Sequence, residues 1–427
     1  MVYILFLLNY RDLLLEGYKM SDLLKQKLVE LGAEPLAEAL LEVSRYCDVA
    51  NELIERLIAT PEENIKRIKR KISGLKRLRR FIDWRGSYEL AQRLKMLIED
   101  LRTSIDDPLT GVELVAAFYE TDKGVLGHCD DSDGYVGDIF RIDAKELFID
   151  YASRCTDKKK VADIISKLNY KDDYGVRSTL IDCAGQCLPE PVIRSMISKF
   201  QRWADKEEDK HRRRYHFMMV EFLARQLLDA KLFEEAYVAA WGKLSTAAIM
   251  DIASIYLERG EVDTAYLWLK KIPEGETYQA DKRDKLLIEI YKRQGDTKKL
   301  TDLLYRKLRS RRSIETLNAL LDVIGDDKRD KVIKEEVALI MESPKMSEVD
   351  AEFLISVEKF DEAATYILRH SEQLNGDHYW NLLHLGKVME SKNQNLAASL
   401  IYRSLLLSIL KRAYVKAYPH GVKYLKS

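Results

Sequence analysis

Glycine and proline, the two residues that most often interrupt regular structure, are scarce: the 427 residues include 19 glycines and 8 prolines. A β-sandwich or β-barrel needs many tight turns, and these two residues supply most of them. Residues that favour helices, above all Leu, Ala, Glu, Lys and Arg, are abundant instead. The sequence therefore predicts an all-α protein.

Cysteine is also rare, and its placement argues against a disulfide framework. The five cysteines are odd in number and scattered: Cys47, Cys129, Cys155, Cys183 and Cys187. Cys183 and Cys187 are four residues apart and would share one helix face, but no second Cys or His pair at zinc-finger spacing accompanies them. We expect two buried thiols there, no metal, and a reducing compartment, the cytoplasm.

Neither charge is in excess, because 70 Lys and Arg residues balance 70 Asp and Glu residues. A neutral chain has no global field that would draw it onto nucleic acid or an acidic membrane, so any electrostatic binding has to be local. The P-loop, the dinucleotide-binding glycine motif, HExxH and GxSxG are all missing. These absences leave an enzymatic activity without support and indicate no cofactor.

Long hydrophobic runs are missing as well. The apolar run at residues 1–8 is far shorter than the roughly 20 residues that a membrane-spanning helix needs. It lacks the basic start and the small-residue cleavage site of a signal peptide. Because Met20 followed by Ser21 and Asp22 looks like a natural start, we expect residues 1–19 to be a start-site extension, and we expect no membrane partner.

A helix pair that recurs along the chain is the most informative pattern present. Residues 253–272 form two apolar helices, broken at Gly260 and restarted at Asp263. Related segments lie at residues 222–241, 288–306, 314–333, 353–368 and 382–402. Such a pair is too small to bury its own apolar face, so copies must stack, as in tetratricopeptide-like arrays with a period of about 34 residues. We expect a solenoid over residues 146–427, closed by a C-terminal capping helix near Tyr424.

An N-terminal helical region, residues 21–145, contains the most basic stretch of the chain. Between residues 65 and 85, ten Lys and Arg residues face one acid. Apolar residues at helical spacing predict a buried stripe, so the charges should form a solvated face. Lys66, Arg70, Arg77 and Arg80 are candidates for binding phosphate or an acidic partner, but such runs are more often simply soluble surface.

Two motifs follow this helix, the triplet Asp83, Trp84 and Arg85 and an Asp-rich loop that contains Asp130 and Asp131. The triplet could bind a carboxylate or phosphate group of a ligand at the surface, with Arg85 beside the Trp84 ring. It could equally be an internal strut in which Arg85 pairs with the loop and Trp84 enters the core. We favour the strut slightly.

The Asp-rich loop, residues 130–138, invites a metal hypothesis. It does not match a calcium-binding loop, because Phe140 stands where the bidentate Glu is required. Carboxylates of Asp130, Asp131 and Asp138 could hold Mg²⁺ and support hydrolysis. Aspartates in such a loop more often cap the next helix, and we favour capping.

Three separated motifs resemble a known family. They are residues 81–85, residues 130–140 and the segment from Tyr402 to Leu425, which contains Ala-Tyr-Pro-His-Gly. In this order they resemble a bacterial family of all-helical proteins of unknown function with a tetratricopeptide-like C-terminal part, over about residues 21–425. The resemblance implies the fold and the order of parts, and it implies no activity.

The function that we expect is a scaffold that binds an unidentified protein partner on the concave face of the array. Four aromatic residues are candidates for this face, although their spacing also fits the core: Tyr256, Trp268, Tyr291 and Trp380. The first alternative is a nucleic-acid-associated protein that uses the basic helix at residues 66–80. The second is a metal-dependent hydrolase at the loop of residues 130–138.

Overall fold

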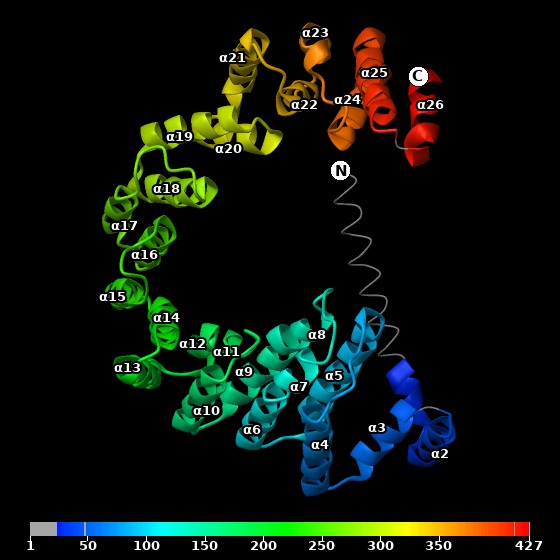
Figure 1. Ribbon diagram of the computed structural model, residues 1–427, viewed down its shortest axis with the longest axis vertical. Helices are drawn as coiled ribbons and strands as arrows, with labels where there is room; N and C mark the ends of the chain where they lie inside the picture. Colours follow the sequence, from blue (N-terminus) through cyan, green and yellow to red (C-terminus); the bar gives the residue numbers. More distant parts are fainter. Residues whose placement is uncertain (1–23, 47, 414, 427) are drawn as a thin grey trace. The chain divides into compact units, whose positions relative to one another are not determined.

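The computed structural model describes residues 24–46, 48–413 and 415–426, and nearly all of its regular structure is helical (Figure 1). In these ranges the only β-type pairing is one isolated bridge, between Ile82 and Cys129. The predicted all-α class is confirmed. Within the same ranges, no helix combines the length and the apolar character needed to cross a membrane. The start-site hypothesis for residues 1–19 lies outside the described residues.

The chain divides into two compact units, residues 1–243 and residues 244–427. This division differs from the boundary expected at residues 145–146, which falls inside the first unit, where Ala144 and Leu147 belong to one buried cluster. The helical elements of the first unit are α2 (Ala33–Ser44), α3 (Asp48–Ile58), α4 (Pro61–Lys76), α5 (Trp84–Ser104), α6 (Pro108–Tyr119), α7 (Asp122–Leu126), α8 (Tyr135–Asp138), η1 (Ile139–Ala144), α9 (Lys145–Arg154), α10 (Lys158–Tyr170), α11 (Thr179–Asp182), α12 (Ala184–Cys187), α13 (Glu190–Lys206), α14 (Lys210–Gln226) and α15 (Ala230–Trp241).

The second unit consists of helices that follow one another in pairs (Figure 1). Its helical elements are α16 (Thr246–Glu258), α17 (Val262–Leu269), α18 (Ala280–Gln294), α19 (Thr297–Ser310), α20 (Ile314–Ile324), η2 (Asp326–Lys328), α21 (Arg329–Glu342), α22 (Glu348–Ser356), α23 (Phe360–Arg369), η3 (Ser371–Gln373), α24 (Tyr379–Ser391), α25 (Asn395–Lys411), η4 (Val415–Ala417) and α26 (Tyr418–Lys426).

Large aromatic side chains fill the core of the first unit, and the hydroxyls of its buried Tyr119 and Tyr151 are hydrogen-bonded. The buried Tyr151 hydroxyl donates to the carbonyl oxygens of Leu101 at 2.8 Å and Ile105 at 3.0 Å. The Tyr151 ring also packs against Gly111, where any Cβ would overlap with it. Since buried polar groups are costly when unpaired, these bonds let α5, α6 and α9 meet over an aromatic core.

Each pair of the second unit turns at a residue with positive φ, and these residues are 30 to 35 positions apart. They are Gly260 (φ 82°), Gly295 (φ 67°), Gly325 (φ 100°), Glu358 (φ 60°) and Asn393 (φ 62°). At four of the five turns, the next backbone N–H bonds the carbonyl oxygen five residues earlier, which is the Schellman pattern that ends a helix. The residue five positions after each of these four turns is buried: Ala265, Leu300, Ala363 and Ala398. The pairs therefore share one local geometry, which Leu228 repeats between α14 and α15.

Buried ion pairs tie distant segments together within each unit. In the first unit, Arg177 bonds Asp122 through two contacts of 2.6 and 2.7 Å, and the two side chains are 7% and 1% exposed. In the second unit, the fully buried Glu336 accepts from Arg309 at 2.9 Å and from Arg312 at 3.0 Å. Arg177 thereby fixes the irregular segment between α10 and α11, and Arg312 fixes the connection between α19 and α20.

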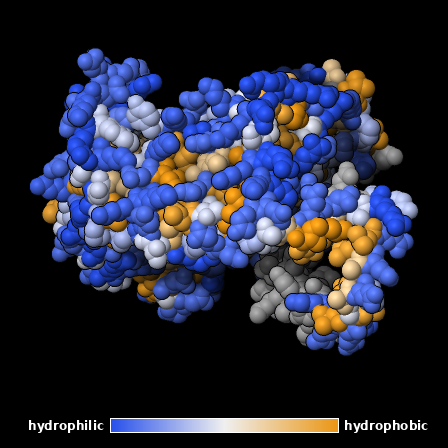
Figure 2. Space-filling model, turned by 90° about the horizontal axis from the view of Figure 1, so that it is seen from below, coloured by the Kyte–Doolittle hydropathy of each residue, from blue (hydrophilic) through white to orange (hydrophobic). Residues whose placement is uncertain are grey.

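The face drawn in Figure 2 is mostly hydrophilic, with groups of hydrophobic residues between hydrophilic ones. Exposed apolar side chains include those of α2 and α3, where Leu41, Val43, Leu57 and Ile58 are all more than half exposed. Within α2 no residue is buried. The cores thus start at α4 and leave the first helices largely solvated.

Replacing Arg177 by Ala is expected to lower the free energy of unfolding of the first unit by about 3–5 kcal/mol, because Asp122 would remain buried without its partner. Urea denaturation followed by circular dichroism measures this change. The matched control is Arg93→Ala, which removes an exposed pair with Glu89 and should cost less than about 0.5 kcal/mol. Equal losses in the two variants would contradict a structural role for the buried pair.

Candidate functional site

The structure brings the Asp-Trp-Arg triplet and the Asp-rich loop next to each other through the backbone. The Ile82 N–H donates to the carbonyl oxygen of His128 at 2.9 Å, and the Asp130 N–H donates to the carbonyl oxygen of Ile82 at 2.9 Å. These two bonds form the isolated bridge. The motifs are therefore joined one residue before the triplet begins.

The favoured strut, with Arg85 paired to the loop and Trp84 in the core, is wrong. Trp84 is 54% exposed, and the Arg85 guanidinium carbon lies 5.2 Å from the centroid of the Trp84 ring. The physical reason is local: Asp83 caps α5 by accepting the Gly86 N–H at 3.2 Å. This cap places Trp84 and Arg85 on the first turn of the helix, which faces solvent. The surface hypothesis for the triplet stays a prediction.

Asp131 in the Asp-rich loop caps the next helix. Its two carboxylate oxygens accept the N–H groups of Val136 and Gly137, both at 2.8 Å. Gly134, with φ 79°, supplies the left-handed turn that brings the loop back over the helix start. Because α8 runs directly into η1 and α9, this carboxylate lies at the positive end of a long helical stretch.

The other loop aspartates do not gather around a shared point. Asp130 accepts hydrogen bonds from the N–H and the hydroxyl of Ser132, and Asp138 is exposed on α8. Across the part of the chain that the structure describes, no three His, Cys, Asp or Glu side chains are grouped so that they could hold a metal ion. Since both oxygens of Asp131 are committed to backbone N–H groups, capping is the better supported of the two hypotheses.

One residue of the basic stretch, Arg67, is buried and not part of a solvated face. Its guanidinium bonds both oxygens of Asp100 on α5 at 2.6 Å. Burial acts to raise the pKa of Asp100, but the hydrogen bonds and charge of Arg67, helped by Lys71, hold it below its ordinary value. The expectation that all these charges are solvated is therefore wrong for Arg67, because helical spacing cannot show a partner on another helix.

The four predicted binding residues of this stretch do not share one helix. Lys66 and Arg70 are exposed on α4, which ends at Lys76, whereas Arg77 lies in a turn and Arg80 in a bend after it. Arg80 and Asp83 line an open cavity of about 510 Å³. The predicted basic helix over residues 66–80 therefore ends after Lys76. Its use as a nucleic-acid interface stays a prediction.

The two cysteines predicted to be small buried side chains are both buried free thiols. Burial raises the pKa of Cys183 to about 12 and that of Cys187 to about 11. Thiols with such values stay protonated at neutral pH, and a thiol is a poor nucleophile in that form. The expectation that both side chains are buried is confirmed.

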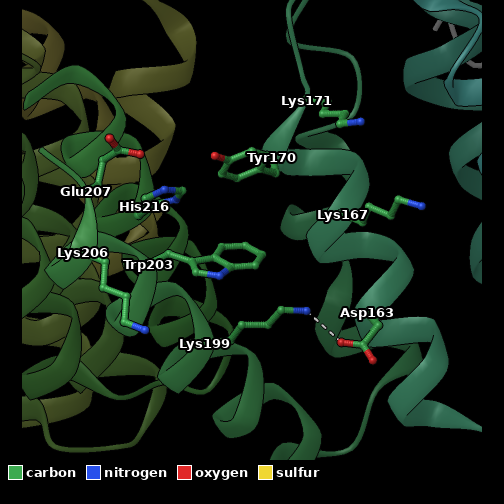
Figure 3. Close-up of a pocket in the computed structure, with 9 residues that line it drawn as sticks. All are labelled: Asp163, Lys167, Tyr170, Lys171, Lys199, Trp203, Lys206, Glu207 and His216. Atoms are coloured by element: carbon green, nitrogen blue, oxygen red, sulfur yellow. Dashed lines mark hydrogen bonds and ion pairs between the residues drawn. The ribbon is translucent and has the colours of Figure 1, made fainter. Parts of the chain in front are cut away.

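A cavity that the sequence did not indicate lies between α10, α13 and α14 (Figure 3). Its volume is about 550 Å³. Nine residues line it: Asp163, Lys167, Tyr170, Lys171, Lys199, Trp203, Lys206, Glu207 and His216. They come from three helices spread over more than fifty positions, so no sequence motif marks the site.

Three rings converge at this cavity. The Tyr170 and His216 rings are nearly parallel, at an interplanar angle of 11° with centroids 5.8 Å apart. Trp203 is tilted against both, with centroids 5.5 Å from Tyr170 and 5.7 Å from His216. Lys199 lies 5.1 Å from the Trp203 ring and bonds Asp163 at 2.8 Å, as the dashed line in Figure 3 shows.

His216 is the most unusual residue of the cavity. It is 2% exposed, and its Nδ1 atom has no hydrogen-bond partner among the described residues. Burial lowers the pKa of His216 below its ordinary value, and nearby Arg212 acts in the same direction while Glu207 opposes it. The imidazole is therefore neutral at pH 7 and keeps an unused hydrogen-bonding atom.

Removing the cap, by Asp131→Ala, is expected to lower the free energy of unfolding by about 1–2 kcal/mol, because two N–H groups at the helix start lose their acceptor. Thermal denaturation with and without Mg²⁺ measures the loss. Asp133→Ala, at an exposed position in the same loop, is the control and should change little. A thermal shift that Mg²⁺ produces in the wild type and not in Asp131→Ala would contradict a purely capping role.

The lowered pKa of His216 predicts a pH dependence of stability. As the pH falls below about 6.5, the unfolded chain binds a proton at this residue that the folded chain does not, so folding becomes less favourable by up to about 1.4 kcal/mol per pH unit. His216→Phe removes this contribution. Urea denaturation between pH 7 and pH 5 should show a shallower loss for the variant than for the wild type, and equal slopes would contradict the prediction.

Comparison with known proteins gives one match. A family model described as a family of unknown function (DUF6880) matches residues 19–427. No curated protein and no solved structure matches the chain. The match covers the whole helical region and confirms the family resemblance of the three sequence motifs. The chain is a member of this family of unknown function.

Proposed function

We propose that residues 244–427 form a tetratricopeptide-like array that binds an acidic segment of a partner protein. The observation that carries this proposal is the repetition of one helix pair geometry, with a left-handed turn every 30 to 35 residues. Arrays of this kind present extended surfaces suited to peptides and helices of other proteins. The step from the fold to this role is an analogy.

A groove between two successive pairs is the binding site that we propose. It has a volume of about 460 Å³ and lies where the pair α16–α17 meets the pair α18–α19. The rings of Tyr266 and Tyr291 line it, with centroids 5.9 Å apart, together with Leu287. Arg283 and Arg306 also line it. It therefore combines apolar contact area with two guanidinium groups.

The charge of the surrounding helices favours an acidic partner. Residues 280–312, which contain α18 and α19, include twelve Lys or Arg residues and five Asp or Glu residues. The ammonium group of Lys299 lies 5.6 Å and 5.7 Å from the centroids of the Tyr266 and Tyr291 rings. Guanidinium groups bind carboxylates in a two-pronged geometry, and opposite charges speed association.

The aromatic residues suggested by the sequence divide between core and surface. Tyr256 and Trp268 stack with centroids 6.5 Å apart, and Trp268 is buried, so both belong to the packing of α16 on α17. Tyr291 lines the groove. Trp380, on α24, is 83% exposed and extends the proposed surface toward the later pairs.

A double reversal of charge, Arg283→Glu with Arg306→Glu, is expected to reduce retention of protein partners at least about tenfold, since two charge-assisted contacts become repulsive. The measurement is affinity capture from nuclease-treated host lysate, read by quantitative mass spectrometry. The control is Lys328→Glu with Lys334→Glu, which makes the same charge change at exposed positions around α21.

Two results would contradict the proposal. Partners that both double variants retain equally would place binding outside the groove. Partners that all disappear after nuclease treatment would favour the nucleic-acid alternative, in which phosphate contacts dominate and binding falls steeply with salt.

A further inference from the structure

We propose that the cavity between α10, α13 and α14 in the first unit binds a small nucleoside phosphate. In this arrangement the base stacks on the rings of Tyr170 and Trp203, and lysine side chains that line the cavity turn toward the phosphate. This site is separate from the groove proposed for a protein partner, because it belongs to the other unit of the chain.

The size and the rings of the cavity specify a planar ligand. A volume of about 550 Å³ falls within the range of small-molecule sites, about 300–1,000 Å³. Tyr170 and Trp203 offer ring faces tilted by 61° to each other, and the buried His216 packs against both. Every nucleobase has a flat π-face that stacks on such rings. A base fits this arrangement better than an aliphatic ligand does.

The charges around the rings specify an anion. Four lysines and two acids line the cavity, and one of the acids, Asp163, is already paired with Lys199. In Figure 3, Lys167 and Lys171 extend from α10 on the side away from His216, and Lys206 stands at the end of α13. Lysine ammonium groups on flexible stems are common phosphate ligands, since they can turn toward the charge.

The three rings lie close together, which favours a mononucleotide over single-stranded nucleic acid as the ligand. Proteins that bind single-stranded nucleic acid place stacking residues one after another along a groove. Here the three rings contact each other, with all centroid distances below 6 Å. The cavity therefore accommodates a single base, and the lysines accommodate its phosphate.

Isothermal titration calorimetry of the full chain tests this proposal. The probes are AMP, GMP, CMP and UMP, with adenosine, guanosine, inorganic phosphate and a ten-residue poly(dT) as comparisons. We expect at least one nucleotide to bind with a Kd below about 1 mM, and its nucleoside and inorganic phosphate to bind at least about tenfold more weakly. Nucleosides that bind as tightly as nucleotides, or phosphate alone that does so, would overturn it.

Two variants assign the binding to this cavity. Neutralising Lys167, Lys171 and Lys206 together, each to Gln, should weaken nucleotide binding at least about tenfold. The matched control neutralises three exposed lysines outside the cavity, Lys159, Lys210 and Lys243, and should leave the affinity unchanged. Equal affinities of the two triple variants would overturn the proposal.

Tryptophan fluorescence gives an independent readout that does not depend on charge. A base that stacks beside Trp203 should quench its emission, and Trp203→Phe should abolish the quenching while calorimetric binding persists. Quenching of the same size in Trp203→Phe would place the ligand elsewhere. Binding of poly(dT) more than tenfold tighter than any mononucleotide would show that a strand is the ligand, and would overturn a mononucleotide site.

Discussion

A pair of short amphipathic helices leaves one apolar face uncovered, and this constraint governs the second unit. The face can be buried only by another pair, so each pair has to leave its turn in a similar direction. The left-handed residue at each turn ends the first helix, and at four of the five turns the next backbone N–H bonds the carbonyl oxygen five residues earlier, which sets that direction. The buried residue five positions later then holds the second helix against the first. At Ala265, Ala363 and Ala398 this residue is small, which allows the two helix axes to approach closely.

Buried charges complement this apolar packing by fixing which segments meet. Arg67 joins α4 to α5 through Asp100, and Arg177 joins the segment after α10 to α7 through Asp122. In the second unit Arg312 bonds Glu336 and Asp350 and so links α21 to α22. Apolar faces slide easily over one another, whereas a guanidinium that has lost its water tolerates only one partner geometry. These pairs therefore select one register among the packings that the apolar residues alone would permit.

The local features of this fold were predictable from the sequence, and the features that depend on a distant partner were not. Helix content and the turns at Gly260, Gly295 and Gly325 follow from composition and periodicity, since glycine adopts positive φ without strain. The turns at Glu358 and Asn393 use the same geometry without glycine, which hid the regular spacing. The placement of Arg67 and of Trp84 depended on Asp100 and on the Asp83 cap. Helical spacing predicts the face of the helix on which a residue lies. It does not predict which residue of another helix contacts that face.

The cavity beside His216 likewise depends on contacts between helices that the sequence does not show. Hydrogen bonds and an ion pair between these helices fix the shape of the cavity. Bonds outside the ring cluster connect the three helices: the Tyr215 hydroxyl on α14 donates to Asn169 on α10 at 2.9 Å, and Lys199 on α13 bonds Asp163 on α10. Because these bonds do not involve the three rings, the helices keep their spacing without help from a ligand. A cavity held open in this way loses little conformational freedom on binding, which favours affinity for a small rigid ligand.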